Sequence, residues 1–291
     1  MTRPGVLEMT FARRGDRSVL AHLHRQVPLL VQQALYWDEH LPGLPCVYVI
    51  TTSGCVLAGD RYDISIDVED GAMAHVTTQS ATRIHKMDDG YASQLQRVSV
   101  ADGGYLELLP GPVIPQHHSR FVSETDAIVS ESATLVSAEI LQPGRKHHGD
   151  GELFEYDLYS SAVTVRRPDG TPLFCEKFTA EPWQHPVRAA GAMGGFDIFG
   201  NVIVVTPVVH ALRILERVAA GTGADSYRAG EAVAAGDGCM TGASLLPNDA
   251  GLVYKVLGAD TQPVKARIRA FWDLVRREVA GVPAPASRPW E

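Results

Sequence analysis

The segment RYDISIDVEDGAMAHVTTQ, residues 61–79, decides the fold class of this chain. Between residues 61 and 69, every even-numbered side chain is apolar and every odd-numbered one is polar. Because successive side chains of a β-strand point to opposite faces, this period of two predicts a half-buried strand. The dipeptide Asp70-Gly71 follows, and a second strand-like run covers residues 73–79. Asp-Gly between two such runs is a hairpin signal, so we predict a β-hairpin here.

The same succession of strand, turn and strand recurs over the first 180 residues. Asp102-Gly103 and Pro168-Asp169-Gly170 each separate two strand-like runs, and we predict hairpins there for the same reason. About a dozen short strands at this spacing favour a sandwich, a barrel or a set of stacked sheets. The further strand-like runs are 47–52, 95–100, 105–109, 121–130, 135–141, 162–166 and 173–178.

Helical patterns appear only after residue 205. Thr206 is a suitable N-cap and Pro207 a suitable first helical residue, and the apolar stripe that follows ends at Gly221. This late arrival of helices predicts a mainly β (α+β) fold, in which a few helices pack on a large sheet layer. The remaining predicted elements are a weak helix over 226–235, strands over 238–246 and 251–257, and a strongly amphipathic helix over 263–280.

Composition and charge limit the partners that we expect. The chain has 291 residues with 45% hydrophobic and 21% charged, which is typical of a globular protein. Its 26 basic and 34 acidic residues give a formal net charge of −8. Nucleic acids and anionic membranes bind clustered positive charge, so we expect neither as a partner.

Cysteine usage and hydropathy indicate the compartment. Cys46, Cys55, Cys175 and Cys239 lie far apart and form no C-x-x-C pair. The first ten residues lack the apolar core of a signal peptide, and no stretch of 18 apolar residues could span a membrane. We therefore expect reduced thiols and a cytoplasmic location.

Common catalytic and nucleotide-binding motifs are missing from the sequence. It contains no Walker A loop, no G-x-S-x-G elbow and no H-E-x-x-H motif. The glycine cluster at 191–195 lacks dinucleotide-binding spacing and is better interpreted as a turn. We therefore predict a protein that binds other molecules and is not an enzyme.

Isolated polar residues admit a structural and a functional interpretation. Asp60 stands between a turn and a strand, where aspartate commonly caps the turn. Glu107 has apolar neighbours and could face a cavity or solvent, and Glu152 is close enough to Arg145 to form an ion pair. His117 and His118 are adjacent, so in a strand they would supply one ligand to each face.

Short motifs along nearly the whole chain resemble those of the urease accessory protein UreD family, called UreH in some organisms. The block Ser53-Gly-Cys-Val-Leu-Ala-Gly-Asp60 resembles the family's S-G-G-x-x-x-G-D, although Cys55 and Ala58 stand where glycines are common. His117-His118 also stands where family members more often carry an apolar or small residue. The other matching motifs are Val76-Thr-Thr-Gln79, Leu106-Glu-Leu-Leu-Pro-Gly-Pro-Val-Ile114, Glu139-Ile-Leu141, Gly144-Arg145 with Gly149, Glu152 and Phe154, Met193-Gly-Gly-Phe196, residues 202–207, residues 251–257, and Trp272 with Arg276-Arg277.

The resemblance implies a urease maturation chaperone. Proteins of this family bind the partner UreF, recruit the GTPase UreG and dock on the urease apoprotein, and a homodimer within the accessory complex is compatible with this role. The implied fold is a two-layer, β-helix-like stack of strands with a few packed helices. It would form a single UreD-like domain over 1–281, strand-rich over 5–205 and helix-containing over 206–281, followed by a flexible tail over 282–291.

The resemblance also implies no tightly bound cofactor, but nickel(II) in transit. Transient binding of nickel needs carboxylate or imidazole groups along a polar path. We predict Asp60, His85, Glu107, His117 and Glu152 as candidates for this path, from their places in matching motifs or their ligand chemistry. For partner docking we expect the late helices, because an apolar helix face can add to the helices of a partner.

Two other functions remain open at this level. One is a β-sheet hydrolase or lyase that uses a histidine and a carboxylate, which requires a pocket with convergent polar groups. The other is a plain protein-interaction module that has no metal role and would not bind nickel.

Overall fold

The computed structural model describes residues 4–220, 233–234 and 238–286. The described residues contain two α-helices, α1 (Val208–Ala220) and α2 (Thr261–Val279), and a short 3₁₀ turn η1 (Pro247–Asp249). All other elements are strands. The strands are β1 (Gly5–Arg14), β2 (Arg17–Gln26), β3 (Leu29–Leu30), β4 (Cys46–Thr51), β5 (Arg61–Val68), β6 (Met73–Thr78), β7 (Thr82–Ile84), β8 (Ala92–Val100), β9 (Tyr105–Leu108), β10 (Val113–Pro115), β11 (Arg120–Val129), β12 (Thr134–Leu141), β13 (Leu158–Arg166), β14 (Pro172–Ala180), β15 (Ile198–Val205), β16 (Val233–Ala234), β17 (Cys239–Leu245) and β18 (Gly251–Gly258).

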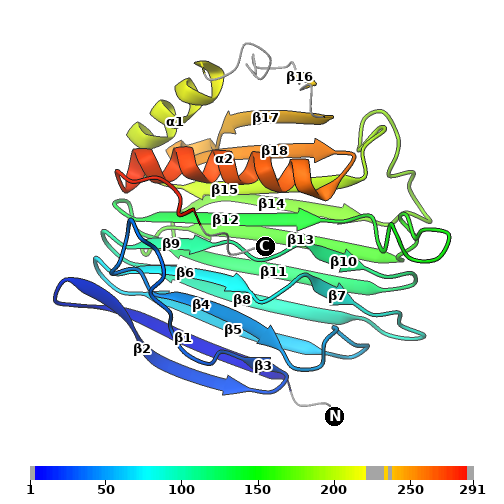
Figure 1. Ribbon diagram of the computed structural model, residues 1–291, viewed down its shortest axis with the longest axis horizontal. Coiled ribbons are helices and arrows are strands. Elements are labelled where there is room, and N and C mark those ends of the chain that lie inside the picture. The colour runs from blue at the N-terminus through cyan, green and yellow to red at the C-terminus, as the bar shows by residue number, and fades with distance from the viewer. Residues whose placement is uncertain (1–3, 221–232, 235–237, 287–291) are drawn as a thin grey trace.

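The strands form two sheets that face each other (Figure 1). A 7-stranded sheet has the order β14-β13-β11-β8-β5-β1-β2. An 11-stranded sheet has the order β16-β17-β18-β15-β12-β9-β6-β4-β3, with β7 and β10 attached at its side. From β4 to β13 the chain alternates between the two sheets, apart from the short strands β7 and β10, and neighbouring strands of this part are parallel. The predicted mainly β, two-layer, β-helix-like stack with late helices is confirmed.

The predicted hairpins at Asp70-Gly71 and Asp102-Gly103 are wrong. β5 and β6 belong to different sheets, as do β8 and β9, so each turn is a corner between the layers. Gly71 and Gly103 have φ of +61° and +65°, a conformation that glycine adopts without strain. The same left-handed turn therefore serves a hairpin and a corner equally well. The third prediction is confirmed, because β13 and β14 pair antiparallel across Asp169-Gly170.

Two apolar cores hold the layers together. The larger core lies between the sheets and is formed by the inward side chains of both, such as Met9, Ile66 and Leu106. The smaller core lies between the 11-stranded sheet and the helices, where Ile268 and Val275 of α2 pack over β15 and β18. Figure 1 shows α2 lying across this outer face. The arrangement leaves the space between the sheets free of helices.

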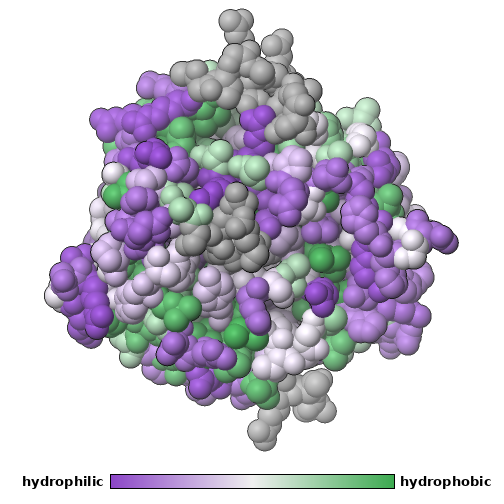
Figure 2. All heavy atoms as spheres, in the orientation of Figure 1, coloured by the Kyte–Doolittle hydropathy of each residue, from purple (hydrophilic) through white to green (hydrophobic). Residues whose placement is uncertain are grey.

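The two late helices differ in what they leave exposed. α2 buries its predicted apolar face against the chain's own sheet, so that face is unavailable to a partner. α1 instead exposes Val208, Val209 and Leu212 beside its buried Ala211 and Ile214. In the space-filling view, hydrophobic side chains are visible among hydrophilic ones in the region of α1 (Figure 2).

Some predicted segments fall outside the described residues. The weak helix predicted over 226–235 does so except for Val233–Ala234, which form β16. The predicted tail over 282–291 is described only as far as residue 286. Among the described helices, neither is long and apolar enough to cross a membrane.

Candidate functional site

A cavity of about 140 Å³ lies between the two sheets. One wall carries Gln94 and Ser123 of the 7-stranded sheet, and the other carries Ser137, Glu139 and Asn201 of the 11-stranded sheet. These side chains point inward because they alternate with residues that face outward along each strand. A water molecule needs roughly 10–15 Å³ by this measure, so the cavity has room for several waters or a hydrated ion. The interior of the stack is therefore polar over part of its length.

Among the described residues that line this cavity, Glu139 is the acidic one. The Tyr159 hydroxyl donates to its Oε1, and the Ser161 hydroxyl donates to Oε2 at 3.1 Å. Burial raises the pKa of Glu139, and the negative charge of Glu176 adds to this effect, while the two hydroxyl donors oppose it. A carboxylate whose pKa is raised in this way gains stability from a nearby cation. A proton or a cation beside Glu139 would therefore offset the cost of burying its charge.

Asn201 adds an unused oxygen to the same wall. It lies directly opposite Glu139 in the pairing of β12 with β15. Its Nδ2 donates to Glu176 Oε1 at 2.9 Å, and Lys255 Nζ lies 2.7 Å from the same oxygen. The Oδ1 atom of Asn201 is buried and accepts no hydrogen bond from the described residues. A buried acceptor without a donor is costly, and a water molecule or a cation in the cavity would satisfy it.

A second pocket, of about 180 Å³, adjoins this cavity. Both are lined by Val49, Thr51, Thr78 and Thr82, and the second extends to Cys55 and Arg83. This pocket lies in the segment where Cys55 and Ala58 replace the family's glycines. Neither residue has a positive φ, so the two substitutions impose no backbone strain on the turn. The cavity thus continues toward the loop that contains the glycine-rich motif.

Asp60 and His85 lie near this end of the stack but do not face each other as a ligand pair. Asp60 Oδ2 accepts from the Leu57 backbone N–H at 2.8 Å and from the Tyr62 hydroxyl at 3.0 Å. Asp60 therefore caps the turn, and it touches the cavity only through Tyr62, which lines it. His85 follows β7, and its side chain is exposed.

His117 and Glu152 are brought together by the fold. His117 Nδ1 lies 3.1 Å from Glu152 Oε1, and Arg145 Nε donates to Glu152 Oε2 at 2.8 Å. Hydrogen bonds from Arg145, together with its charge, lower the pKa of Glu152 to about 2. The ion pair expected between Arg145 and Glu152 is confirmed. Glu152 is thus already neutralised by a guanidinium group.

The substitution Glu152→Gln should lower the free energy of unfolding by about 1–3 kcal/mol at neutral pH, because it removes a charge-assisted pair and leaves Arg145 uncompensated. The pKa of this carboxyl is lower in the folded chain than its ordinary value of 4.5. Its stabilisation is therefore complete above pH 4.5 and is lost as the pH falls toward about 2. Urea unfolding of both proteins across this range checks the prediction, and a difference that does not shrink on acidification would contradict it.

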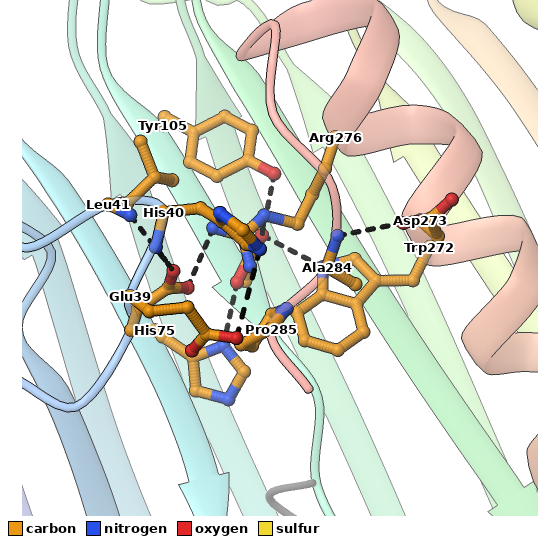
Figure 3. A network of polar contacts seen from close by, with 12 residues as sticks. Glu39, His40, Leu41, His75, Tyr105, Trp272, Asp273, Arg276, Ala284 and Pro285 are labelled. Atoms are coloured by element: carbon orange, nitrogen blue, oxygen red, sulfur yellow. Dashed lines mark hydrogen bonds and ion pairs between the residues drawn. The ribbon is translucent and has the colours of Figure 1, made fainter. Parts of the chain in front are cut away.

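Glu107 lies on the opposite, outer face of the 11-stranded sheet, beneath α2, because Trp272 and Arg276 of that helix contact its carboxylate. Figure 3 shows these two residues with His75 and Tyr105. Glu107 Oε1 accepts from the Tyr105 hydroxyl at 2.7 Å and from Trp272 Nε1 at 2.8 Å. Its Oε2 lies 2.7 Å from His75 Nδ1, as expected for residues directly opposite each other in β6 and β9. Glu107 is fully buried and does not line the cavity.

Arg276 completes this network from α2. Its Nη2 lies 2.7 Å from Asp38 Oδ2, and its Nε lies 3.4 Å from Glu107 Oε1. Burial alone would raise the pKa of Glu107, but the hydrogen bond with His75 and the charge of Arg276 outweigh burial and hold the pKa below its ordinary value. The network therefore attaches α2 and the loop around Asp38 to the sheet through paired charges.

The five predicted path residues thus occupy different places. Four lie toward the end of the stack that carries β7 and β10, and Glu107 lies under α2. In the described part of the chain, no three histidine, cysteine, aspartate or glutamate side chains are grouped so as to hold a metal ion. A role of these residues in nickel transfer stays a prediction.

Glu139 and Asn201 were not predicted as site residues. Glu139 stands in the strand-like run at 135–141, where it is the one charged residue among apolar and small neighbours. That signal does not reveal which sheet face is inward, because both faces of β12 are covered. Asn201 carries no sequence signal beyond its place between a glycine and a run of valine and isoleucine.

Comparison with known proteins agrees with the resemblance in the motifs. A family model described as UreD urease accessory protein matches residues 3–291. The chain is 49% identical over 284 residues to urease accessory protein UreD 2 of Brucella suis biovar 1, covering 98% of this chain and 90% of that protein. It is 47% identical over 288 residues to urease accessory protein UreD of Photorhabdus laumondii, covering 99% and 86%. This chain therefore belongs to the UreD family of urease accessory proteins.

Proposed function

We propose that this chain is a chaperone that carries nickel(II) in transit between its two sheets during urease maturation. It would do so in the cytoplasm, within a complex with UreF, UreG and the urease apoprotein. Membership of the UreD family supports the role in urease maturation. The observation that carries the nickel proposal is Glu139, a carboxylate of raised pKa that lines a cavity of mixed polar and apolar side chains between the sheets.

The chemistry of the cavity suits a passing divalent ion. Glu139 offers a carboxylate, Asn201 a buried amide oxygen, and Ser137 a hydroxyl on the same wall. Carboxylate and neutral oxygen donors bind nickel less tightly than a cluster of imidazoles and thiolates would. Moderate affinity lets an ion enter and also leave, which a carrier requires.

The hydrolase or lyase alternative receives less support. It needs a histidine and a carboxylate that converge on one pocket. Among the described residues, the cavity lining contains no histidine. The close histidine–carboxylate pairs, such as His75 with Glu107 and His117 with Glu152, lie outside that lining.

Co-expression of the urease genes with and without this chain tests the proposal. We expect urease without it to assemble but to contain little nickel and show little activity. Supplying the chain should restore both, as measured by metal analysis of purified urease and by ammonia release. Equal nickel content in the two preparations would rule the proposal out.

The exposed apolar residues of α1 are our candidate surface for UreF. Val208, Val209 and Leu212 lie on adjacent positions of the helix and are 37%, 46% and 45% exposed. The double substitution Val209→Glu/Leu212→Glu should abolish co-purification with UreF, because it places two charges in an apolar interface. Glu216→Ala, on the same helix, should leave co-purification unchanged. Retention of UreF by the double variant would show that it docks elsewhere.

A further inference from the structure

We propose that Lys255 and Glu176 are positioning residues for the cavity, because together they hold the amide of Asn201 with its oxygen toward the cavity. They lie at a seam where polar side chains join one edge of the 7-stranded sheet to the 11-stranded sheet. This role rests on the proposed function, since it prepares the same cavity for a passing cation.

Glu176 reaches from one sheet to the other. It belongs to β14, the edge strand of the 7-stranded sheet, whereas Asn201 and Lys255 belong to β15 and β18 of the 11-stranded sheet. Asn201 and Lys255 stand directly opposite each other in the pairing of these two strands. The Oε1 atom of Glu176 lies 2.9 Å from Asn201 Nδ2 and 2.7 Å from Lys255 Nζ. One carboxylate oxygen therefore joins three strands across the gap between the sheets.

The carboxylate of Glu176 decides which way the Asn201 amide is turned. A carboxylate paired with an ammonium group can only accept hydrogen bonds, so the amide must present its NH2 group to it and not its oxygen. The oxygen then points away from Glu176, and it accepts no hydrogen bond from the described residues. Asn201 is only 6% exposed and lines the cavity, so this oxygen is available to a ligand there.

Lys255 is held at the seam by aromatic side chains. Its Nζ lies 5.5 Å from the centroid of the Phe199 ring, within the range of a cation–π contact. Phe199 in turn stacks on Phe178 of β14, with 4.9 Å between the ring centroids. The ammonium group therefore stays beside Glu176 and offsets its negative charge.

The orientation of the amide matters because Glu139 is its neighbour. Glu139 and Asn201 stand directly opposite each other in the pairing of β12 with β15, which places their Cβ atoms about 4.5–5.5 Å apart. If the amide were turned over, its NH2 group would donate to the Glu139 carboxylate. A cation in the cavity would then meet a hydrogen-bond donor where it now meets an oxygen.

The seam also sets the charge of Glu139. The negative charge of Glu176 raises the pKa of Glu139, and the positive charge of Lys255 lowers it. The pair therefore controls both acceptors that face the cavity here, one through its orientation and the other through its affinity for a proton.

The substitution Glu176→Met tests the orientation in the chain alone, without nickel or urease. Methionine offers only a weak acceptor, while Lys255 can still donate to the amide oxygen, so we expect the Asn201 amide to turn over. In NMR spectra, nuclear Overhauser contacts of the Asn201 NH2 group with residue 176 should be replaced by contacts with Glu139. An NH2 group that stays turned toward residue 176 would overturn the role of Glu176.

The titration of the Glu139 carboxyl group, followed by carbon-13 NMR, tests both residues of the seam. Lys255→Met should raise the pKa of Glu139 and Glu176→Met should lower it, because each removes one of two opposing charges. Lys177→Met is the matched control, since Lys177 is exposed on β14 and does not line the cavity. It should leave the titration unchanged. Shifts in the same direction for Lys255→Met and Glu176→Met, or none in either, would contradict the role of the pair.

Urease maturation gives the functional readout. Urease matured with Glu176→Met should contain about tenfold less nickel, the scale of losing a group that orients a ligand, whereas Lys177→Met should give the normal content. Normal nickel content with Glu176→Met, although the amide has turned over, would overturn the inference. The proposed function fails on a different result, which is normal nickel content with Glu139→Gln.

Discussion

The substitution Arg276→Ala is expected to lower the free energy of unfolding by about 3–5 kcal/mol, the range for breaking a buried ion pair by removing one partner. Arg276 is fully buried, and its guanidinium lies between Asp38 and Glu107. Without it, two carboxylates stay buried with no cation between them. The part of α2 around this position should then pack less tightly on the sheet, while the apolar side chains of the helix still contact it.

Arg277 provides a matched control in the next position of the same helix. Its Nε lies 2.7 Å from Asp273, four residues earlier, and its side chain is 54% exposed. Exposed pairs of this kind contribute roughly 0–1 kcal/mol, so Arg277→Ala should change stability little. Chemical denaturation followed by tryptophan fluorescence measures both. Equal stability of the two variants would mean that the network does not hold α2.

The substitution Glu139→Gln is expected to lower the nickel content and activity of the matured urease by about tenfold, the scale of losing one group that tunes a metal site. Glutamine keeps the shape of the side chain and can still accept from Tyr159 and Ser161, so the fold should be preserved. What it removes is the negative charge facing the cavity.

Glu124→Gln is the control for this effect. Glu124 is exposed on β11, among residues that alternate with the cavity-lining Ser123 and Thr125. The substitution Glu124→Gln removes one negative charge, as Glu139→Gln does, but at a position that does not line the cavity. Both variants should co-purify with urease and its accessory partners. Wild-type nickel content with Glu139→Gln would show that this carboxylate does not handle the ion.

Periodicity predicted most of the elements but not how they connect. The runs at 61–69, 121–130 and 135–141 are strands because alternation is a local property of the backbone. The assignment of neighbouring strands to one sheet or two depends on contacts between distant residues. An Asp-Gly turn does not indicate whether the two strands it joins belong to the same sheet. Two of the three predicted hairpins are therefore wrong.

The first two strands show a second limit. β1 and β2 pair over almost their whole length, yet neither was predicted, and β2 has no regular alternation. Its alternation is interrupted at Ala21, where the register shifts by one residue against β1.

Site residues were harder to predict than strands, for a related reason. Glu107 and Glu139 both stand in apolar runs, and the sequence does not distinguish them. One faces α2 and has all its oxygens engaged, and the other faces the cavity. The two side chains point to opposite faces of the same sheet, Glu139 toward the other sheet and Glu107 toward α2, and only the structure shows which residues of each strand face inward. The motif resemblance predicted the family, which comparison confirms, but not this distinction.

The most direct test of the central claim, that nickel passes between the sheets, is the nickel content of urease matured by a chain whose cavity is filled. Ser123→Phe places a ring in the cavity, and Val122→Phe places the same ring on the outer face of the same strand. Both preparations should contain equal amounts of assembled complex, measured by co-purification. We predict that urease matured with Ser123→Phe contains little nickel and that urease matured with Val122→Phe contains the normal amount. Equal, normal nickel content in both would contradict passage through the cavity.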